Sequence, residues 1–413
     1  MQSRMVRPAL QAYITLRSQF LLRFLELSMA RMESKELLTR LVGFDTVSRN
    51  SNLAAIDFIR DYLDGQGIAS RLTFDDTRQK ANLFATIGPA DRPGLILSGH
   101  SDVVPVDDQD WSSDPFRMVD SDGRWYGRGT ADMKGFIATV LALVPELKAR
   151  AKRAPVHLAF SYDEEVGCAG VGRLIEQIGM AEARPFACLI GEPTGMVPMV
   201  GQKGLHSFRC RVHGRESHSS LAPYGVNAVE AAAETITRIK AIARRIATEG
   251  PFNHGFDPPY STLHCGTVHG GTAQNIVPAL CDFSFEVRNI PGHDVDAIFA
   301  EIERYARDEI EPQMTRIDPA TGFKFQTRSR LPDYAIDAQH DAVRLVQSAL
   351  GSDEVGHASF MTEAGLFGRA GIPTIICGPG GIGQAHKPDE FIEADEIARC
   401  EAFLLRLAEQ AVS

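Results

Sequence analysis

The sequence predicts an α/β protein with a discontinuous outer domain and a second domain inserted into it. Short apolar runs such as Gly94–Ser98 and Val156–Tyr162 are typical of buried strands. They alternate with helical patterns such as Gly135–Lys148, which favours a mostly parallel sheet flanked by helices. Between residues 200 and 330 the order changes to strand, helix, strand, strand, helix, strand, and the α/β pattern then resumes.

The elements of the outer domain are predicted from the spacing of apolar residues, beginning at Met32. In one expected helix Ile56, Ile59 and Leu63 share a face, and Gly65 ends the pattern. The expected helices are Ser34–Gly43, Ala54–Gly65, Gly135–Lys148, Gly170–Ile178, Asp337–Leu350 and Asp395–Ala411. The expected strands are Ile68–Phe74, Asn82–Ile87, Gly94–Ser98, Val156–Tyr162, Phe186–Ile190 and Ile372–Cys377. The outer domain is therefore expected at residues 32–199 and 331–413.

The inserted domain is expected to span residues 200–330. Leu205–Val212 alternates as a half-buried strand does, and Val226–Ala247 is a long alanine-rich pattern with one apolar face. The other expected elements are strands at Ser261–Val268, Leu280–Asn289 and Gly322–Arg328 and a helix at Val295–Ile310. This order is that of the ferredoxin-like βαββαβ unit.

Composition limits the classes of partner. The chain has 413 residues, 44% of them hydrophobic, which is enough to bury the cores of two domains. A formal net charge of -10 disfavours nucleic acid and anionic membrane, because both need a basic surface. The seven cysteines are scattered and form no Cys-x-x-Cys pair, which indicates reduced thiols and a cytoplasmic protein.

The first 31 residues differ from the rest of the chain. They carry five arginines and a single acidic residue, Glu26. Charged residues interrupt the apolar run, so it matches neither a membrane span nor a secretory signal. We expect an N-terminal extension that is not part of the fold.

Polar residues recur where predicted strands end. His100, Glu164, Glu165, Glu192 and His386 each follow such a strand closely, and Asp132 lies in a glycine-rich loop before a helix. In open α/β sheets ligands bind outside the carboxyl ends of the strands. Histidine and carboxylate together suit zinc, cobalt or manganese, and two metals about 3.5–4 Å apart need a shared carboxylate.

Each of these residues also has an ordinary interpretation. Adjacent glutamates often begin a solvated helix, and Glu192 before a proline fits a turn. Asp132 fits an N-terminal helix cap. These interpretations weaken when the residues are taken together, because the same topological position recurs after four different strands.

Four segments resemble a known family. They are Ser-Gly-His-Ser-Asp-Val-Val-Pro at 98–105, Gly-Arg-Gly-Thr-Ala-Asp-Met-Lys-Gly at 127–135, Asp-Glu-Glu at 163–165 and Gly-Glu-Pro-Thr at 191–194. In this order they resemble the motifs of the dinuclear zinc amidohydrolases and peptidases. That family includes acetylornithine deacetylases, succinyl-diaminopimelate desuccinylases, aminoacylases and carboxypeptidase G. Two further segments, Thr362–Phe367 and Cys377–Phe391, resemble the acetylornithine deacetylases in particular.

The resemblance implies two divalent metal ions, zinc first and cobalt as a competent substitute. It implies that Asp132 bridges them, that His100 and Glu192 complete one site, and that Glu165 and His386 complete the other.

Further roles follow from the same resemblance. Asp102 would hydrogen-bond the far nitrogen of His100, and Glu164 would be the general base. His218 would reach the partner subunit's active site and stabilise the oxyanion, which implies a homodimer with the inserted domain as dimerisation and lid domain. The residues expected to contact substrate are Arg288, Asn275 and Glu363. Arg288 suits a carboxylate, although a surface arginine on a strand would look the same.

Gly378–Gly383 also fits the Gly-x-Gly-x-x-Gly pattern of dinucleotide-binding proteins. We reject a dehydrogenase, because Pro388 follows where an amphipathic helix would have to open.

The reaction implied by the resemblance is removal of acetyl from N2-acetyl-L-ornithine, which yields L-ornithine and acetate for arginine synthesis. The alternatives are a succinyl-diaminopimelate desuccinylase, another amidohydrolase of N-acyl amino acids, or a metallopeptidase. An alternative of a different class is a catalytically inactive binding protein on the same scaffold.

Overall fold

The computed structural model describes residues 32–180 and 183–412. Within these residues the chain forms two compact units. The first contains residues 32–165, 176–180, 183–196 and 378–412, and the second contains 166–175 and 197–377. The expected extension at 1–31 lies outside the described residues. The domain boundaries expected at 199/200 and 330/331 stay a prediction.

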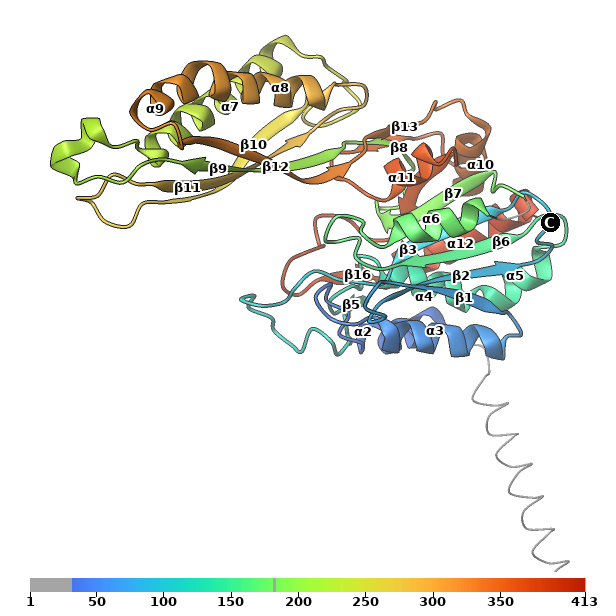
Figure 1. Cartoon of the computed structure of the whole chain (residues 1–413). Helices are drawn as coiled ribbons and strands as arrows, with labels where there is room; N and C mark the ends of the chain where they lie inside the picture. Colours follow the sequence, from blue (N-terminus) through green and yellow to red (C-terminus); the bar gives the residue numbers. More distant parts are fainter. Residues whose placement is uncertain (1–31, 181–182, 413) are drawn as a thin grey trace, which may run out of the picture. The chain divides into compact units, whose positions relative to one another are not determined.

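The first unit contains a sheet, a small second sheet and helices (Figure 1). Its helices are α2 (Ser34–Val42), α3 (Leu53–Gly65), α4 (Lys134–Ala142), α5 (Val144–Arg150) and α12 (Ala394–Val412). Its strands are β1 (Ser70–Phe74), β2 (Ala81–Ile87), β3 (Leu95–His100), β4 (Val119–Ser121), β5 (Arg124–Tyr126), β6 (Val156–Ser161), β7 (Ala187–Pro193) and β16 (Phe391–Glu393). Helix α6 (Val171–Gly179) and strand β15 (Thr374–Gly378) each have residues in both units.

The larger sheet of this unit runs in the order β1-β2-β6-β3-β7. Strand β3 is parallel to both β6 and β7, so the carboxyl ends of these three strands lie at one edge. Strand β2 is antiparallel to β1 and to β6. The expected parallel sheet is therefore confirmed at its centre, while its outer edge is antiparallel. All residues of β3, β6 and β7 are buried, as expected for short apolar runs.

The helix expected at Gly135–Lys148 is divided into α4 and α5 at Leu143. Pro145 lies in the first turn of α5, where its missing N–H costs nothing, whereas inside a continuous helix it would remove a hydrogen bond. Every residue of α4 is buried, including Lys134.

The small sheet joins two segments that are far apart in the chain. Its order is β16-β5-β4, and Phe391 pairs with Tyr126. Next to this pair the Gly127 N–H donates to the carbonyl oxygen of Glu390 at 2.8 Å. The loop that precedes α4 therefore lies beside the loop that precedes β16.

The second unit contains the expected ferredoxin-like sheet (Figure 1). Its four strands are β9 (Leu205–His213), β10 (Thr262–Gly270), β11 (Leu280–Arg288) and β12 (Gly322–Leu331), all antiparallel in the order β10-β11-β9-β12. Its helical segments are the 3-10 segment η1 (Ser219–Tyr224), α7 (Ala228–Glu249), α8 (Val295–Tyr305), the π-helical segment η2 (Ala306–Ile310) and α9 (Glu311–Ile317). Alternate residues of β9 are buried in one core with the apolar faces of α7 and α8.

The second unit also contains short elements outside this sheet. They are β8 (Met199–Gln202), β13 (Tyr334–Ala335), β14 (Gly356–Ala358), α10 (Asp341–Leu350) and α11 (Ala364–Arg369). Strand β8 pairs with β13, β14 and β15. Helix α10 starts four residues later than expected, because His340 accepts a hydrogen bond from the Ala342 N–H at 3.1 Å and so caps it.

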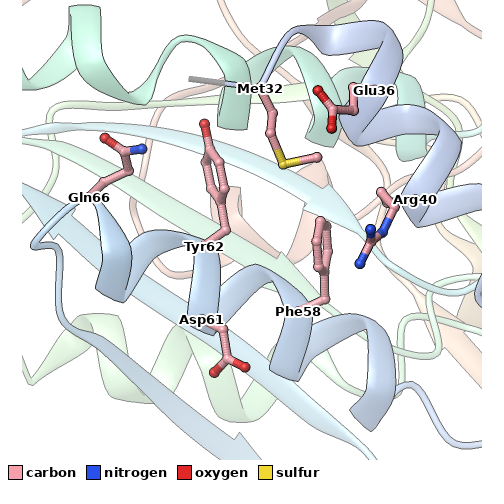
Figure 2. A pocket seen from close by; sticks show the side chains of 7 residues that line it. All are labelled: Met32, Glu36, Arg40, Phe58, Asp61, Tyr62 and Gln66. Carbon is pink, nitrogen blue, oxygen red and sulfur yellow. The ribbon is translucent and has the colours of Figure 1, made fainter. Parts of the chain in front are cut away.

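A hollow of about 250 Å³ is lined by residues of α2, α3 and their flanks, including Arg40, Phe58 and Tyr62 (Figure 2). None of the residues predicted to carry chemistry lines this hollow. Among the described residues, helices that combine the length and the apolarity needed to cross a bilayer are absent.

Candidate active site

Two of the predicted metal ligands lie inside strands rather than after them. His100 is the last residue of β3, and Glu192 is the sixth residue of β7. Both strands run further than their apolar runs, because main-chain pairing such as His100 with Ser161 of β6 does not require apolar side chains. The parallel arrangement of these strands brings both side chains to the same edge of the sheet.

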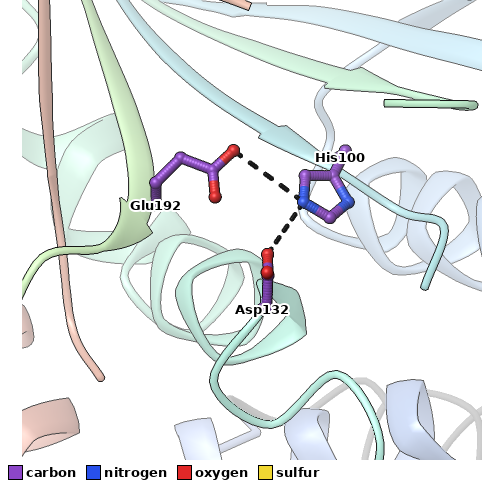
Figure 3. A group of neighbouring side chains, drawn as sticks. All are labelled: His100, Asp132 and Glu192. Carbon is purple, nitrogen blue, oxygen red and sulfur yellow. Dashed lines mark hydrogen bonds and ion pairs between the residues drawn. The ribbon is translucent and has the colours of Figure 1, made fainter. Parts of the chain in front are cut away.

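The first group of side chains is His100, Asp132 and Glu192 (Figure 3). His100 Nε2 lies 3.0 Å from Asp132 Oδ1 and 3.8 Å from Glu192 Oε1. The three side chains are 1%, 6% and 6% exposed, so the group is buried. Asp132 comes from the loop between β5 and α4, and the other two come from β3 and β7.

The second group is Asp132, Glu165 and His386. His386 Nε2 lies 3.2 Å from Asp132 Oδ2 and 3.2 Å from Glu165 Oε1. Its side chain is 50% exposed, whereas that of Glu165 is 8% exposed. His386 lies in the loop before β16 and has a φ of 64°, an uncommon conformation for a residue other than glycine. Asp132 thus uses one oxygen toward each group.

The ordinary interpretations of these residues do not fit the structure. The N-cap of α4 is Met133, which makes no side-chain cap hydrogen bond, so Asp132 is not the cap. Glu164 and Glu165 lie in a turn that ends before α6 begins at Val171, so they do not begin a helix.

The carboxylates raise the pKa of both imidazoles. Burial lowers the pKa of His100, but the hydrogen bond with Asp132 and the charge of Glu192 outweigh it, and the net shift is strongly upward. The hydrogen bonds of His386 with Asp132 and Glu165 raise the pKa of His386 to about 10. The carboxylates therefore create a negative electrostatic potential at the two groups, which strongly favours positively charged species there.

The carboxylates themselves respond in opposite directions. Burial and the negative charge of Asp132 raise the pKa of Glu192 and of Glu165. Burial alone would raise the pKa of Asp132, but the hydrogen bonds from His100 and His386 lower it. Several buried carboxylates cannot all ionise without a compensating cation, which is the electrostatic environment of a metal site.

The tautomer of His100 is set by the main chain. His100 Nδ1 lies 2.9 Å from the main-chain carbonyl oxygen of Asp102, to which a ring nitrogen can only donate. In the neutral ring the Nε2 lone pair therefore faces Asp132 and Glu192, as a metal ligand requires. The Asp102 carboxylate was expected in this role, but its Oδ1 lies 3.6 Å from Nδ1. The carbonyl oxygen of the same residue makes the hydrogen bond instead.

The Asp102 carboxylate orders the loop after β6. It accepts hydrogen bonds from the main-chain N–H of Glu164 at 3.1 Å and of Glu165 at 3.3 Å, and from the Ser48 hydroxyl at 2.7 Å. Asp102 is 2% exposed. It therefore positions both glutamates through their main chain.

Glu164 lies beside the groups without belonging to either. It is 6% exposed, and its charge contributes to the raised pKa of His100 and of Glu192. A carboxylate in this position can exchange a proton with a molecule bound at the groups.

The remaining predicted residues belong to the second unit. His218 is exposed and accepts a hydrogen bond from the Ser220 N–H, and Asn275 is exposed, with its carbonyl oxygen accepting from the Ser219 N–H at 2.9 Å. The structure thus brings the segments of His218 and Asn275 together. Arg288 ends β11 and pairs with Glu286 at 3.0 Å, and its side chain is 35% exposed. Glu363 is 1% exposed and precedes α11. Their functional roles stay predictions.

Sequence reasoning missed two charged residues next to the ligand loops. Arg128 and Glu390 are each 1% exposed and form an ion pair at 2.6 Å. Both belong to the segments that resemble the family, but nothing in the sequence indicates that they meet. The only available signal was a charged residue inside a segment otherwise rich in glycine and turn formers.

Comparison with known proteins agrees with this geometry. Residues 96–410 match the sequence profile of peptidase family M20/M25/M40. The acetylornithine deacetylase of Myxococcus xanthus is 35% identical over 376 residues, which cover 89% of this chain and 95% of that protein. The acetylornithine deacetylase of Klebsiella pneumoniae (strain 342) is 35% identical over 321 residues, which cover 77% of this chain and 80% of that protein.

Solved structures show the same fold. A tripeptidase from Staphylococcus aureus subsp. aureus Mu50 has a TM-score of 0.71 at 19% identity, covering 92% of this chain and 97% of that one. An M20 family metallo-carboxypeptidase from Sulfolobus solfataricus has a TM-score of 0.73 at 17% identity, covering 92% and 99%. At these identities the likeness concerns the fold alone.

Proposed function

The chain belongs to peptidase family M20/M25/M40, a family of metal-dependent hydrolases, and from that premise we propose that it deacetylates N2-acetyl-L-ornithine to L-ornithine and acetate. The observation that carries the reaction class is the pair of His and carboxylate groups that share Asp132. The substrate is supported by relatives that are 33–35% identical over most of the chain and are named acetylornithine deacetylase.

The chemistry of the donor atoms fits two divalent ions. Each group offers one imidazole nitrogen and carboxylate oxygens within 4.8 Å of one another, which suits zinc and also cobalt. His100, Asp132 and Glu192 would hold one ion, and Asp132, Glu165 and His386 the other. Bound zinc or cobalt supplies Lewis acidity to the amide carbonyl and to the attacking water.

Glu164 would act as the general base. Its main chain is held by Asp102, and Glu164 is not a member of either ligand group. It would take the proton from the attacking water and then give that proton to the leaving amine. Glu165 cannot do this while its oxygens bind an ion, so the two adjacent glutamates have different tasks.

The variant E164Q tests this assignment. We expect the turnover number to fall by about 10²–10⁴-fold, the range typical of general acid–base catalysis, with metal content unchanged. The checks are steady-state kinetics with acetylornithine and elemental analysis of the purified protein. Substantial activity in E164Q would refute the role, and a wild type that neither binds zinc or cobalt nor responds to them would favour an inactive binding protein.

A substrate panel tests the choice of acyl group and amino acid. With zinc or cobalt added, kcat/KM is compared for acetylornithine, succinyl-diaminopimelate, acetylmethionine and a dipeptide. We expect acetylornithine to be preferred. Preference for one of the other three would replace the substrate and leave the hydrolase class intact. Arg288, Asn275 and Glu363 are the residues we propose for substrate contacts, with Arg288 reading the carboxylate.

We also propose a homodimer in which His218 serves the partner's active site. Strand β10 is an edge strand of the ferredoxin-like sheet, largely exposed, and carries Val268 at 55% exposure. Such an edge is suited to pairing with another chain. Co-expressed E164Q and H218A chains should recover activity, because one site in the mixed dimer is then complete. Recovery would fail if His218 acted within its own chain.

The seven free cysteines support a reducing, cytoplasmic setting as part of this proposal.

A further inference from the structure

Arg128 and Glu390 form a buried ion pair that touches both ligand loops but belongs to neither group of metal ligands. Arg128 Nη1 lies 2.6 Å from Glu390 Oε2, and each side chain is 1% exposed. A buried ion pair is retained at a cost in desolvation and stabilises little by itself. Its other contacts therefore indicate what it does.

Glu390 holds the main chain of the Asp132 loop. Its Oε1 accepts hydrogen bonds from the N–H groups of Gly129 at 3.1 Å, Ala131 at 2.9 Å and Asp132 at 3.1 Å. Three N–H groups that point toward one place form a concave anion-binding site of main-chain atoms. In this chain the Glu390 carboxylate occupies that site. Glu390 thereby fixes the main chain that presents the carboxylate shared by both groups.

Arg128 holds the other loop. Its Nη1 donates to the carbonyl oxygen of Lys387 at 3.2 Å, and its Nη2 donates to Gln109 Oε1 at 2.6 Å. Gln109 Nε2 in turn donates to the carbonyl oxygen of His386 at 3.1 Å. The planar guanidinium thus joins the main chain at His386 to the carboxylate that holds Asp132.

We propose that the Arg128–Glu390 pair is a positioning clamp that sets the distance between Asp132 and His386 and so the affinity of the second metal site. The proposal rests on the proposed metal-dependent function. Neither residue is a member of either ligand group, and both bind the main chain of the ligand loops. Partners of this kind typically change metal affinity by about 10–100-fold when they are removed.

The chain offers a matched control nearby. Arg124 and Glu393 form an ion pair at 2.8 Å, but their side chains are 46% and 38% exposed. They lie on β5 and β16, the same paired strands from which the two loops depart. An exposed pair of this kind contributes little to stability, and it contacts neither ligand.

The test uses the double variant R128M/E390M, which removes both charges of the pair together, beside the control R124M/E393M. The first readout is amide hydrogen exchange of residues 127–133 in metal-free protein, and the second is the affinity for zinc by titration against a chelating indicator. In R128M/E390M we expect these amides to exchange at least about tenfold faster than in the wild type. We also expect the zinc affinity of the His386 site to fall by about 10–100-fold. The control should match the wild type in both readouts.

Wild-type amide exchange and zinc affinity in a folded R128M/E390M protein would overturn the clamp. If that variant does not fold, E390Q replaces it: glutamine keeps an oxygen for the three N–H groups but turns an amide toward Arg128. Faster exchange at 127–133 in E390Q supports the clamp, and unchanged exchange overturns it. The exchange readout needs no metal, so a wild type that binds no zinc would refute the proposed function while the clamp is still tested.

Discussion

The two groups that share Asp132 lie in different surroundings. In the His100 group, imidazole and carboxylates come from strand ends and a buried loop, and the side chains are 1–6% exposed. In the His386 group the imidazole lies on a loop, with its side chain 50% exposed. The first group is held by the sheet, whereas the second depends on contacts between loops.

Asp132 therefore lies between one buried group and one group whose imidazole is half-exposed. His100 is paired with Ser161 of β6 and Glu192 lies within β7, so an ion there would meet preorganised ligands. The loop of His386 is joined to the loop of Asp132 by the contacts of Arg128 and Glu390. We therefore expect the His386 group to hold its ion less tightly and to exchange it more readily.

The largest effect is expected from D132A, which removes the ligand that both groups share. Both ions should lose their normal occupancy, and turnover should fall to background, because neither remaining pair of ligands is sufficient. Elemental analysis and kcat measure the two effects. The control is D91A, at an exposed aspartate in the turn before β3. One ion retained at wild-type affinity in D132A would contradict the sharing.

A smaller effect is expected from removing one ligand at a time. E192A should lower the zinc affinity of the buried site, and H386A should lower that of the half-exposed site. Each affinity should fall by more than about 100-fold, the upper end of the loss expected when a residue that only positions a ligand is removed. Zinc titration of each variant should then show one site near wild-type affinity. If H386A loses both ions, the His100 group is not independent and the comparison fails.

A still smaller effect, about 10–100-fold in affinity, is expected from D102N. Its carboxylate holds the main chain of Glu164 and Glu165, whereas its unchanged carbonyl oxygen bonds His100. D102N should therefore weaken the site that contains Glu165 and spare the His100 site. The control is D107N, whose carboxylate pairs with Arg49 on the surface. Selective weakening of the His100 site would instead restore the side-chain role that the family resemblance implied.

The smallest expected effect is a difference between the rates at which the two ions are released. On addition of a chelator the wild type should release its ions in two phases, and the first should come from the half-exposed His386 group. Release followed with an indicator dye, with H386A as reference, identifies the phases: H386A should show only the slow one. A single phase in the wild type would indicate that both ions leave through one common opening.

Periodicity alone predicted most of the fold. The ferredoxin-like order of the second unit and the central parallel strands of the first follow from apolar spacings. The errors occurred where other forces decided. Strand β3 continues through His100 because its main chain stays paired with β6, and β7 extends past its apolar run to Pro193. Pro145 divides a helix that the apolar pattern left continuous.

The candidate ligands were suggested by their positions at strand ends and in a glycine-rich loop, and the family resemblance implied their roles. The structure brings all five together in two groups around Asp132. The contacts of Asp102 and Glu390 could not be predicted from the sequence, because their carboxylates accept hydrogen bonds from main-chain N–H groups. Every residue except proline has such a group, so residue identity does not indicate the contact. The roles of His218, Arg288, Asn275 and Glu363 stay predictions.

The sequence by itself determined the classes of element, the family resemblance and the set of candidate ligands, because these depend on local spacing and residue chemistry. Only the tertiary structure decided which oxygen of Asp132 faces which imidazole, that a carbonyl oxygen sets the tautomer of His100, and that Arg128 meets Glu390. The physical reason is that hydrogen bonds and ion pairs depend on distances of about 3 Å between segments that lie far apart in the chain.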